Sequence, residues 1–256
     1  MREKTRTRLG EAGFGAPHRH FRVTDSTNAR ARELVEAGAS HGTVVTAAEQ
    51  TAGRGRQGRA WTAPAGKGLL YSAILRPLDE RHLLLPLSVP LAVCEAAEAL
   101  RPGIECAVKW PNDVWLDERK LAGVLIEAKP QDGWAVIGVG LNLAVAPEEF
   151  PDELRWPATS LWTDARSVGG PMEPQRSTRA PERARRALDD ALTRWVEAPR
   201  DEVLRAWRSR DALRGREISW DGGSGIAEGI EDSGDLVVVA GDDRLVLGAG
   251  EVHLRL

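Results

Sequence analysis

The sequence predicts an α+β fold, in which helices pack on one face of a mixed, largely antiparallel sheet and a small β domain follows. Three observations lead to this expectation. Predicted strands outnumber helices, several strands are joined by short turns, and from Gly215 onward the chain consists of short strands at close spacing. We therefore expect a flexible N-terminus at 1–20, a main domain at 21–212 and a small β-barrel at 213–256.

Apolar periodicity and turn residues give the order of the elements. In the main domain, strands are expected at 21–24, 43–48, 68–75, 104–109, 120–127 and 134–139, with 114–116 continuing the fourth of them. A helix opened by 25–28 and ended by Gly38 is expected first, followed by helices at 83–100, 185–196 and 201–210. Helical turns are expected at 147–149 and 159–162, and a mobile loop at 163–183. Five further strands are expected at 217–220, 225–230, 236–239, 244–247 and 251–254.

Composition excludes several classes of protein. The net charge of -3 over 256 residues gives no global basic field for coating nucleic acid. Cys94 and Cys106 match no common metal or redox spacing, so we expect two reduced thiols. No apolar targeting segment occurs near Met1, and the most apolar run, 83–93, is interrupted by prolines. We expect a cytoplasmic protein without a membrane anchor.

The most distinctive stretch is the loop at 53–59, Gly-Arg-Gly-Arg-Gln-Gly-Arg, which follows a β-branched run. Its glycines let the backbone approach a ligand closely, and its arginines carry forked donors suited to phosphate or carboxylate oxygens. The glycine spacing matches the dinucleotide fingerprint, but no helix follows and Pro64 comes almost at once, so we reject a Rossmann site. The loop predicts a ligand that bears a phosphate, and its glycine content favours mobility before binding.

Scarce residue types mark the other candidate segments. Only five of the thirty-five basic residues are lysines, and asparagine occurs three times, at Asn28, Asn112 and Asn142. Lysines and asparagines coincide with 26–28, 109–113, Lys120 and 138–142. These segments contain no nucleophilic triad and no metal-ligand cluster. Their cations and amides suit phosphoryl or nucleotidyl transfer, in which positioning and charge stabilisation supply most of the rate.

In order and spacing, 53–59 with Trp61, Lys109-Trp-Pro-Asn-Asp113, 120–123 and Gly138-Val-Gly-Leu-Asn142 resemble the motifs of the biotin protein ligases. The resemblance implies a catalytic domain of the class II aminoacyl-tRNA synthetase type and a C-terminal SH3-like barrel. It implies that biotin and ATP form biotinyl-5'-AMP and pyrophosphate. A lysine of a biotin carboxyl carrier domain, as in acetyl-CoA carboxylase, then accepts the biotin.

The same resemblance implies roles for individual residues. The catalytic residues would be Arg56, Lys120 and Asp113. Biotin would be held by Ser26, Thr27, Asn28, Gln50, Arg54, Gly55, Arg56, Lys120, Gly123 and Gly140. ATP and the adenylate would be held by Arg56, Arg59, Trp61, Lys109, Asn112, Lys120 and Asn142. Mg²⁺ would accompany ATP, with no protein ligands predicted. Gln57 lies outside this set, and we expect it to tolerate substitution.

Partners follow from the same resemblance, and two alternatives stay open. We expect a carrier domain as acceptor, a possible homodimer, and no DNA binding, since about twenty residues precede the catalytic module. A lipoate ligase or lipoyl transferase would share the fold and the adenylate chemistry. An RNA-binding module would use the Arg-Gly loop, although the chain has a single tyrosine and three phenylalanines for base stacking.

Overall fold

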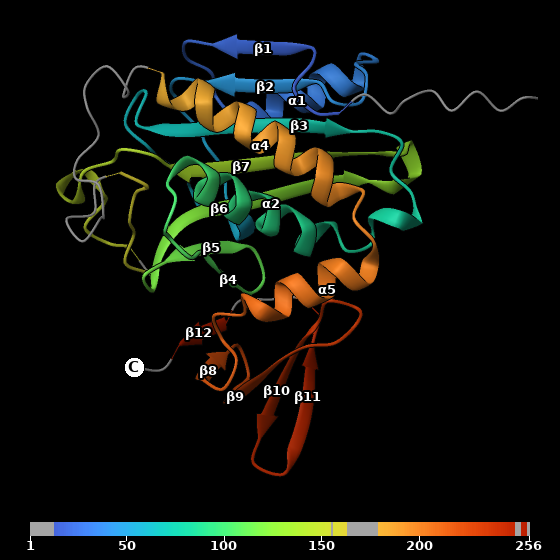
Figure 1. The fold of residues 1–256 in the computed structure, drawn as a ribbon, viewed down its shortest axis with the longest axis vertical. Coiled ribbons are helices and arrows are strands. Elements are labelled where there is room, and N and C mark those ends of the chain that lie inside the picture. The colour runs from blue at the N-terminus through green and yellow to red at the C-terminus, as the bar shows by residue number, and fades with distance from the viewer. Residues whose placement is uncertain (1–12, 155, 163–178, 249–251, 255–256) are drawn as a thin grey trace, which may run out of the picture.

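The computed structural model describes residues 13–154, 156–162, 179–248 and 252–254, and two sheets organise them. The larger has seven strands in the order β1-β2-β3-β7-β6-β5-β4, and the smaller has five in the order β11-β10-β9-β8-β12 (Figure 1). The larger sheet comprises β1 (His18–Phe21), β2 (Val44–Ala47), β3 (Gly68–Leu75), β4 (Ala107–Lys109), β5 (Asp113–Leu116), β6 (Arg119–Lys129) and β7 (Trp134–Asn142). Only the β1–β2 pair is parallel among these seven described strands, which confirms the mixed, largely antiparallel sheet.

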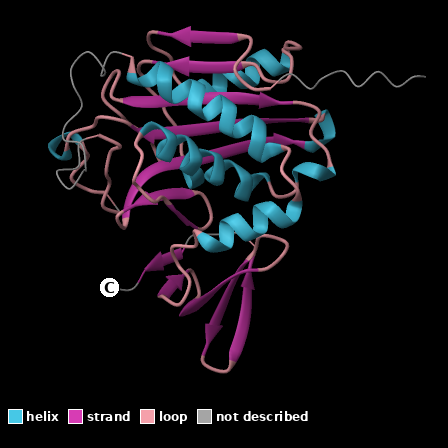
Figure 2. Ribbon diagram, viewed as in Figure 1, coloured by secondary structure: helices cyan, strands magenta, loops and turns pink. Residues whose placement is uncertain are grey.

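Helices cover both faces of this sheet, so the expectation of one covered face is wrong (Figure 2). The helices are α1 (Thr27–Glu36), α2 (Leu85–Leu100), α4 (Ala180–Val196) and α5 (Arg200–Ser209). On β3 the hydroxyl of Tyr71 reaches Asp189 of α4, whereas the next residue, Ser72, bonds to Thr27 and Asn28 of α1. All eight residues of β3 are consequently buried. A strand covered on both faces loses the apolar–polar alternation that would reveal its second partner.

The C-terminal sheet is antiparallel and begins after α5. Its strands are β8 (Glu217–Trp220), β9 (Gly223–Ile230), β10 (Leu236–Ala240), β11 (Asp243–Leu247) and β12 (Val252–Leu254). In the described residues β11 and β12 form its two edges, so the pairings leave the sheet open; closure into an SH3-like barrel stays a prediction.

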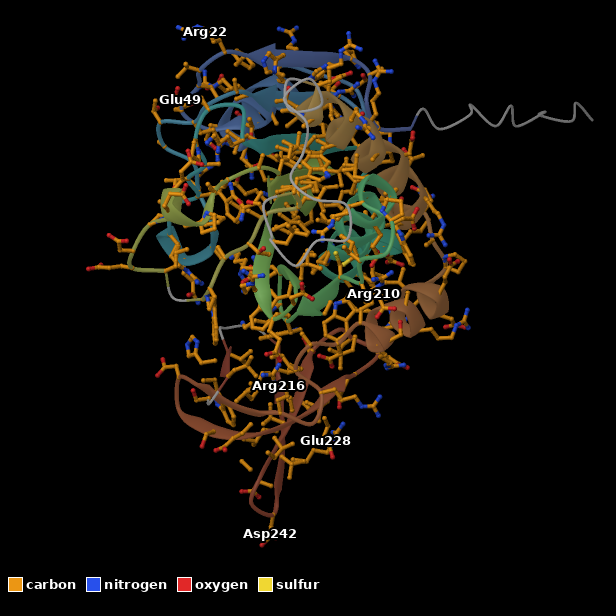
Figure 3. The ribbon with its side chains drawn as sticks, turned by 60° about the vertical axis from the view of Figure 1, so that its left-hand side comes forward. Arg22, Glu49, Arg210, Arg216, Glu228 and Asp242 are labelled. Atoms are coloured by element: carbon orange, nitrogen blue, oxygen red, sulfur yellow. The ribbon has the colours of Figure 1, made fainter. Side chains whose placement is uncertain are left out.

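Contacts at the junction fasten the two sheets together. In Figure 3, Arg210 and Arg216 lie between them and Asp242 lies at the far tip of the smaller one. The segment after α5 pairs with the edge strand β4, because Val108 N donates to Arg210 O at 2.7 Å and Ala212 N donates to Val108 O at 3.0 Å. Trp110 Nε1 also donates to Gly234 O at 3.1 Å.

The N-terminal expectation needs correction. Residues 13–20 are not a flexible segment, since Phe14 is buried in the core and Gly15 N donates to Gly42 O at 3.0 Å. The first strand lies at His18–Phe21 instead of 21–24, because it pairs in parallel with β2. Residues 1–12 lie outside the described part of the chain.

The chain reverses at 110–112, where we expected one strand to continue. β4 and β5 are separate antiparallel strands, with Lys109 opposite Asp113. Asn112 fixes the turn against β6, since its Nδ2 donates to Val124 O at 2.7 Å and its backbone oxygen accepts from Val124 N at 3.0 Å. Proline within the segment is a turn signal, but its neighbours have the pattern of a strand.

Two expectations between β7 and α4 are also affected. Residues 147–149 form the predicted helical turn, but 159–162 is not helical, since Thr159 N donates to Lys120 O and Leu161 N to Asn142 O. Of the loop expected at 163–183, residues 163–178 lie outside the described residues, and 180–183 form the first turn of α4. No helix in the described residues is long and apolar enough to cross a bilayer.

Asp189 provides a pH test of the packing of α4 on β3. Tyr71 donates to its Oδ1 at 2.9 Å and Arg185 contacts its Oδ2, yet burial raises the pKa of Asp189 from 3.8 to about 6. Because the folded protein binds this proton more tightly than the unfolded chain, the contribution to stability is greatest at low pH and is lost as pH rises through about 6.

We therefore expect wild-type protein to lose thermal stability relative to Asp189→Asn as pH rises from about 4 to 6, with a constant difference above about 7. Thermal midpoints of both proteins across this range would measure the effect. A difference that does not change with pH would contradict it.

Candidate active site

The candidate site lies on the face of the large sheet that α1 only partly covers. α1 packs its apolar side on Val45, Ile74 and Val136. Farther along the same face the sheet positions are glycines: Gly123 pairs with Gly140, and Gly138 lies one position along β7 on that face. The missing side chains leave a cavity of about 420 Å³ above the strands.

Every residue that we predicted for the site lines this one cavity. The set is Ser26, Thr27, Asn28, Gln50, Arg54, Gly55, Arg56, Arg59, Trp61, Lys109, Asn112, Asp113, Lys120, Gly123, Gly140 and Asn142. These residues come from α1, the loop after β2, and strands β4 to β7, so segments more than a hundred residues apart in the chain converge.

At one end, the start of α1 forms a compact polar cluster. Gln50 Oε1 accepts from Thr27 N at 2.6 Å and from Thr27 Oγ1 at 3.0 Å, and thus takes the place of a side-chain cap. Ser26 occupies the N-cap position but makes no capping hydrogen bond with its side chain. Its backbone amide donates to Asp25 Oδ1 at 2.6 Å, which holds the pKa of Asp25 below its ordinary value.

Asn28 has its amide orientation fixed by its neighbours. Ser72 Oγ donates to Asn28 Oδ1 at 2.6 Å, while Asn28 Nδ2 donates to Glu127 Oε2 at 2.8 Å. The amide lies directly on Gly138, where an added Cβ would come within 2.2 Å of Asn28 Oδ1. This end of the cavity therefore presents preorganised neutral donors and acceptors, suited to an uncharged polar group.

The glycine–arginine loop covers the cavity. Gly53 is buried, and an added Cβ would meet Trp61 O at 2.3 Å, so the base of the loop requires glycine. The loop closes through Trp61 N donating to Gly53 O at 3.0 Å and Gly55 N donating to Arg59 O at 2.7 Å. Gln57 at its tip has a φ of 54°, a conformation that bulky β-branched residues adopt poorly, so its expected tolerance has a backbone limit.

The Trp61 indole lies against the glycine floor. A Cβ added to Gly140 would lie 2.1 Å from the indole, and one added to Gly123 would lie 3.0 Å from it. The indole Nε1 is buried without a hydrogen-bond partner among the described residues. A buried donor of this kind is costly unless a ligand or water completes it.

Cations concentrate in the middle of the cavity. Five basic and two acidic side chains line it, in a chain whose net charge is -3. Lys120 Nζ lies 2.7 Å from the buried Asp113 carboxylate and 5.7 Å from the Trp61 ring centroid. Lys109, only 2% exposed, lies 5.0 Å from the Trp156 ring centroid. The local excess of positive charge favours an anionic ligand.

The two remaining asparagines support strands. Asn112 holds the β4–β5 turn against β6, and Asn142 Nδ2 donates to Thr159 O at 3.1 Å. Each amide nitrogen is thereby occupied by a backbone carbonyl. These two side chains therefore act mainly by holding in place the backbone that lines the cavity.

Several lining or supporting residues were missed by sequence reasoning. Ser72 is a polar residue inside an apolar strand, and that contrast could have revealed it. Glu127 ends an apolar run and shows its role only through the fold. Trp156, which stacks on His253 of the small sheet at a centroid distance of 5.9 Å, follows an irregular segment that gives no signal. Among the described residues, no group of three or more His, Cys, Asp or Glu could hold a metal ion.

Comparison with known proteins agrees with this geometry. The model of the Biotin/lipoate A/B protein ligase family matches residues 20–143. The chain is 37% identical over 259 residues to the Biotin--[acetyl-CoA-carboxylase] ligase of Mycobacterium tuberculosis, covering 95% of this chain and 92% of that protein. It is 39% identical over 148 residues to the Bifunctional ligase/repressor BirA of Bacillus subtilis, a match that covers 54% of this chain and only 44% of that protein.

A solved structure has a similar fold. The biotin protein ligase from Aquifex aeolicus in complex with biotin and ATP superposes with a TM-score of 0.74 at 29% identity, covering 94% of this chain and 99% of that one.

Gly140→Ala tests the packing of Trp61 on the floor. The new methyl group must displace the indole, and losing a contact worth about 2 kcal/mol should speed trypsin cleavage after Arg54, Arg56 or Arg59 by roughly tenfold or more. Peptide mapping during limited digestion would measure this. Gly248→Ala is the matched control, because its added Cβ would meet nothing closer than 3.3 Å. Equal cleavage rates in both variants would contradict the packing argument.

Proposed function

Since this chain belongs to the biotin/lipoate A/B protein ligase family, among its biotin protein ligases, we propose that it attaches biotin to a protein in two ATP-dependent steps. Biotin and ATP would first give biotinyl-5'-AMP and pyrophosphate. The biotinyl group would then pass to a lysine of a biotin carboxyl carrier domain. The observation that carries this proposal is the single cavity, which joins a neutral polar end to a cationic middle and an aromatic cover.

The neutral end suits the ureido ring of biotin, which bears N–H donors and a carbonyl acceptor. Asn28 and the Thr27–Gln50 pair offer both kinds of group at fixed positions. The apolar Leu70, Val139 and Leu125 line the same cavity and suit the thiophane ring and the aliphatic chain.

The cationic middle suits the first chemical step. A carboxylate oxygen of biotin attacks the α-phosphorus of ATP and forms the new O–P bond of the mixed anhydride. The bond between the α-phosphorus and the pyrophosphate oxygen breaks, and pyrophosphate leaves. Two anionic reactants must approach each other, so Lys120 and Arg56 would lower the repulsion and stabilise the charge that develops on the phosphoryl oxygens. Asp113 would hold the Lys120 ammonium in place through its 2.7 Å ion pair.

In the second step the neutral amine of the acceptor lysine attacks the carbonyl carbon of the anhydride. An amide bond forms, AMP leaves with the bonding electrons, and the amine gives up a proton. The loop at 53–59 would exclude water from the adenylate until the acceptor arrives. Arg59, Trp61, Lys109, Asn112 and Asn142 would surround the nucleotide.

Mg²⁺ would enter with ATP. The lining offers two carboxylates, Asp113, which is already paired with Lys120, and the exposed Glu153. This donor set fits an ion that is carried mainly by phosphate oxygens and water. When bound, the ion would offset phosphate charge.

The partner would be the carrier domain of a biotin-dependent carboxylase, as the names of the relatives suggest for those proteins. A cytoplasmic location, a possible homodimer and the lack of DNA binding remain our predictions. A lipoate ligase would share the chemistry, but two relatives that align with 95% and 90% of this chain are named as biotin ligases.

One assay tests the proposal. The protein is incubated with ATP, Mg²⁺, labelled biotin and a carboxyl carrier domain, and with labelled lipoate and a lipoyl domain in parallel. We expect label on the carrier lysine in the first mixture and none in the second. The reverse result would favour the lipoyl alternative, and tight RNA binding without labelling would favour the RNA-binding alternative.

Lys120→Met tests the role of the central ammonium. Removing one preorganised donor should lower the rate of biotinyl-AMP formation by about 10²–10³, measured as pyrophosphate release. Lys129→Met is the control, because Lys129 lies on the same strand and pairs with Glu36 at the surface. The double variant Asp113→Asn with Lys120→Met avoids an unpaired buried carboxylate. If that folded double variant kept the wild-type rate, Lys120 would have no such role.

A further inference from the structure

Glu127 of β6 joins three segments at the edge of the cavity without lining it. Its Oε2 accepts from Asn28 Nδ2 at 2.8 Å, and its two oxygens accept from Arg54 Nη2 at 3.1 and 3.2 Å. Its Oε1 also accepts from Arg32 Nη1 at 3.3 Å. The carboxylate, whose side chain is 25% exposed, thus links β6, helix α1 and the glycine–arginine loop.

The bond to Asn28 decides how that amide is turned. A carboxylate can only accept hydrogen bonds, so the group facing it must be the Asn28 Nδ2 donor. Ser72 Oγ, on the other side, donates to Asn28 Oδ1 at 2.6 Å. In the flipped amide the Asn28 oxygen would face the Glu127 carboxylate, acceptor against acceptor, so Glu127 excludes that orientation.

The bond to Arg54 decides where the loop rests. The Arg54 guanidinium, which lines the main cavity, is paired with Glu127. Two residues farther on, Arg56 lines both the main cavity and a second cavity of about 360 Å³ beside it. Anchoring Arg54 therefore sets the start of the loop turn, η1 (Arg56–Gly58), that brings Arg56 to the cavity.

We propose that Glu127 is a positioning residue with two effects. It anchors the loop at 53–59 through Arg54, and it fixes the Asn28 amide in the orientation that binds the ligand. Its effect on catalysis rests on the proposed function, in which Asn28 contacts biotin and the loop retains the adenylate. Its effect on the loop itself does not. The two effects can be separated because one carboxylate oxygen serves Asn28, while the negative charge serves Arg54.

Hydrogen exchange of the ligand-free protein tests the anchor. In Glu127→Gln and in Arg54→Ala, amides of residues 53–61 should exchange roughly two- to fivefold faster, as expected for a partly exposed ion pair. The double variant should be no faster than either single variant, since both remove the same link. Arg32→Ala is the matched control and should keep wild-type exchange, because it removes the other arginine from Glu127 without touching the loop.

Raising the salt concentration should bring the exchange rate of wild-type protein towards that of Glu127→Gln, since such a pair is screened. The anchor would be overturned if the amides of residues 53–61 exchanged at the wild-type rate in Glu127→Gln. Additive increases of the exchange rate in the double variant would overturn it as well.

Steady-state kinetics test the amide orientation. Glutamine can still accept from Asn28, so Glu127→Gln should leave the KM for biotin within about twofold of wild type while free biotinyl-AMP escapes faster. Glu127→Ala removes the acceptor as well and should raise the KM for biotin about tenfold, the effect of one lost hydrogen bond to a charged group. The KM for ATP should change little in both variants.

Equal KM values for biotin in Glu127→Ala and Glu127→Gln would refute the orienting role. Absence of biotin transfer by the wild-type protein would instead refute the proposed function. The exchange rates of residues 53–61 would still support or overturn the anchor in that case, because they are measured without ligand.

Discussion

The site depends on the absence of side chains at Gly123, Gly138 and Gly140. In an antiparallel sheet, alternate residues of neighbouring strands meet on one face, so these three positions form one continuous floor. Asn28 and Trp61 rest on that floor at distances that a Cβ would not permit. The polar end, the cavity and the aromatic cover all depend on the absence of side chains at these three positions. The pairing of β6 with β7 keeps the three positions next to one another.

The cations in the cavity depend on the same sheet for their orientation. Asp113 and Lys120 lie on adjacent strands, and their ion pair is nearly shielded from water on the Asp113 side. In such surroundings the effective dielectric constant is lower than in water. A charge therefore interacts more strongly with a bound anion than it would at the surface. The arginines of the loop, which lie outside the sheet, add to this field.

Local patterns were sufficient to predict much of this from the sequence. The glycine–arginine loop, the strand 68–75 and the hairpin of β6 and β7 each carry their signal in adjacent residues. The resemblance to the biotin protein ligases implied the sixteen residues that share one cavity. The failures concern information that is not local. The pairing of His18–Phe21 with β2, the helix on the second face of β3 and the reversal at 110–112 each depend on a partner elsewhere in the chain. The role of Glu127 was not predicted for the same reason, because its three partners lie in α1 and in the loop.

The pairing of the segment after α5 with β4 has a consequence for how the molecule can be divided. Val108 exchanges backbone hydrogen bonds with Arg210 and Ala212, so residues 210–212 serve as a cover on one edge of the large sheet although they lead into the small one. If the larger domain were expressed alone and ended at Ser209, that edge would present unpaired backbone groups, the usual starting point for strand-to-strand aggregation. The point at which the chain can be cut is therefore set by β4, and it lies beyond the end of α5.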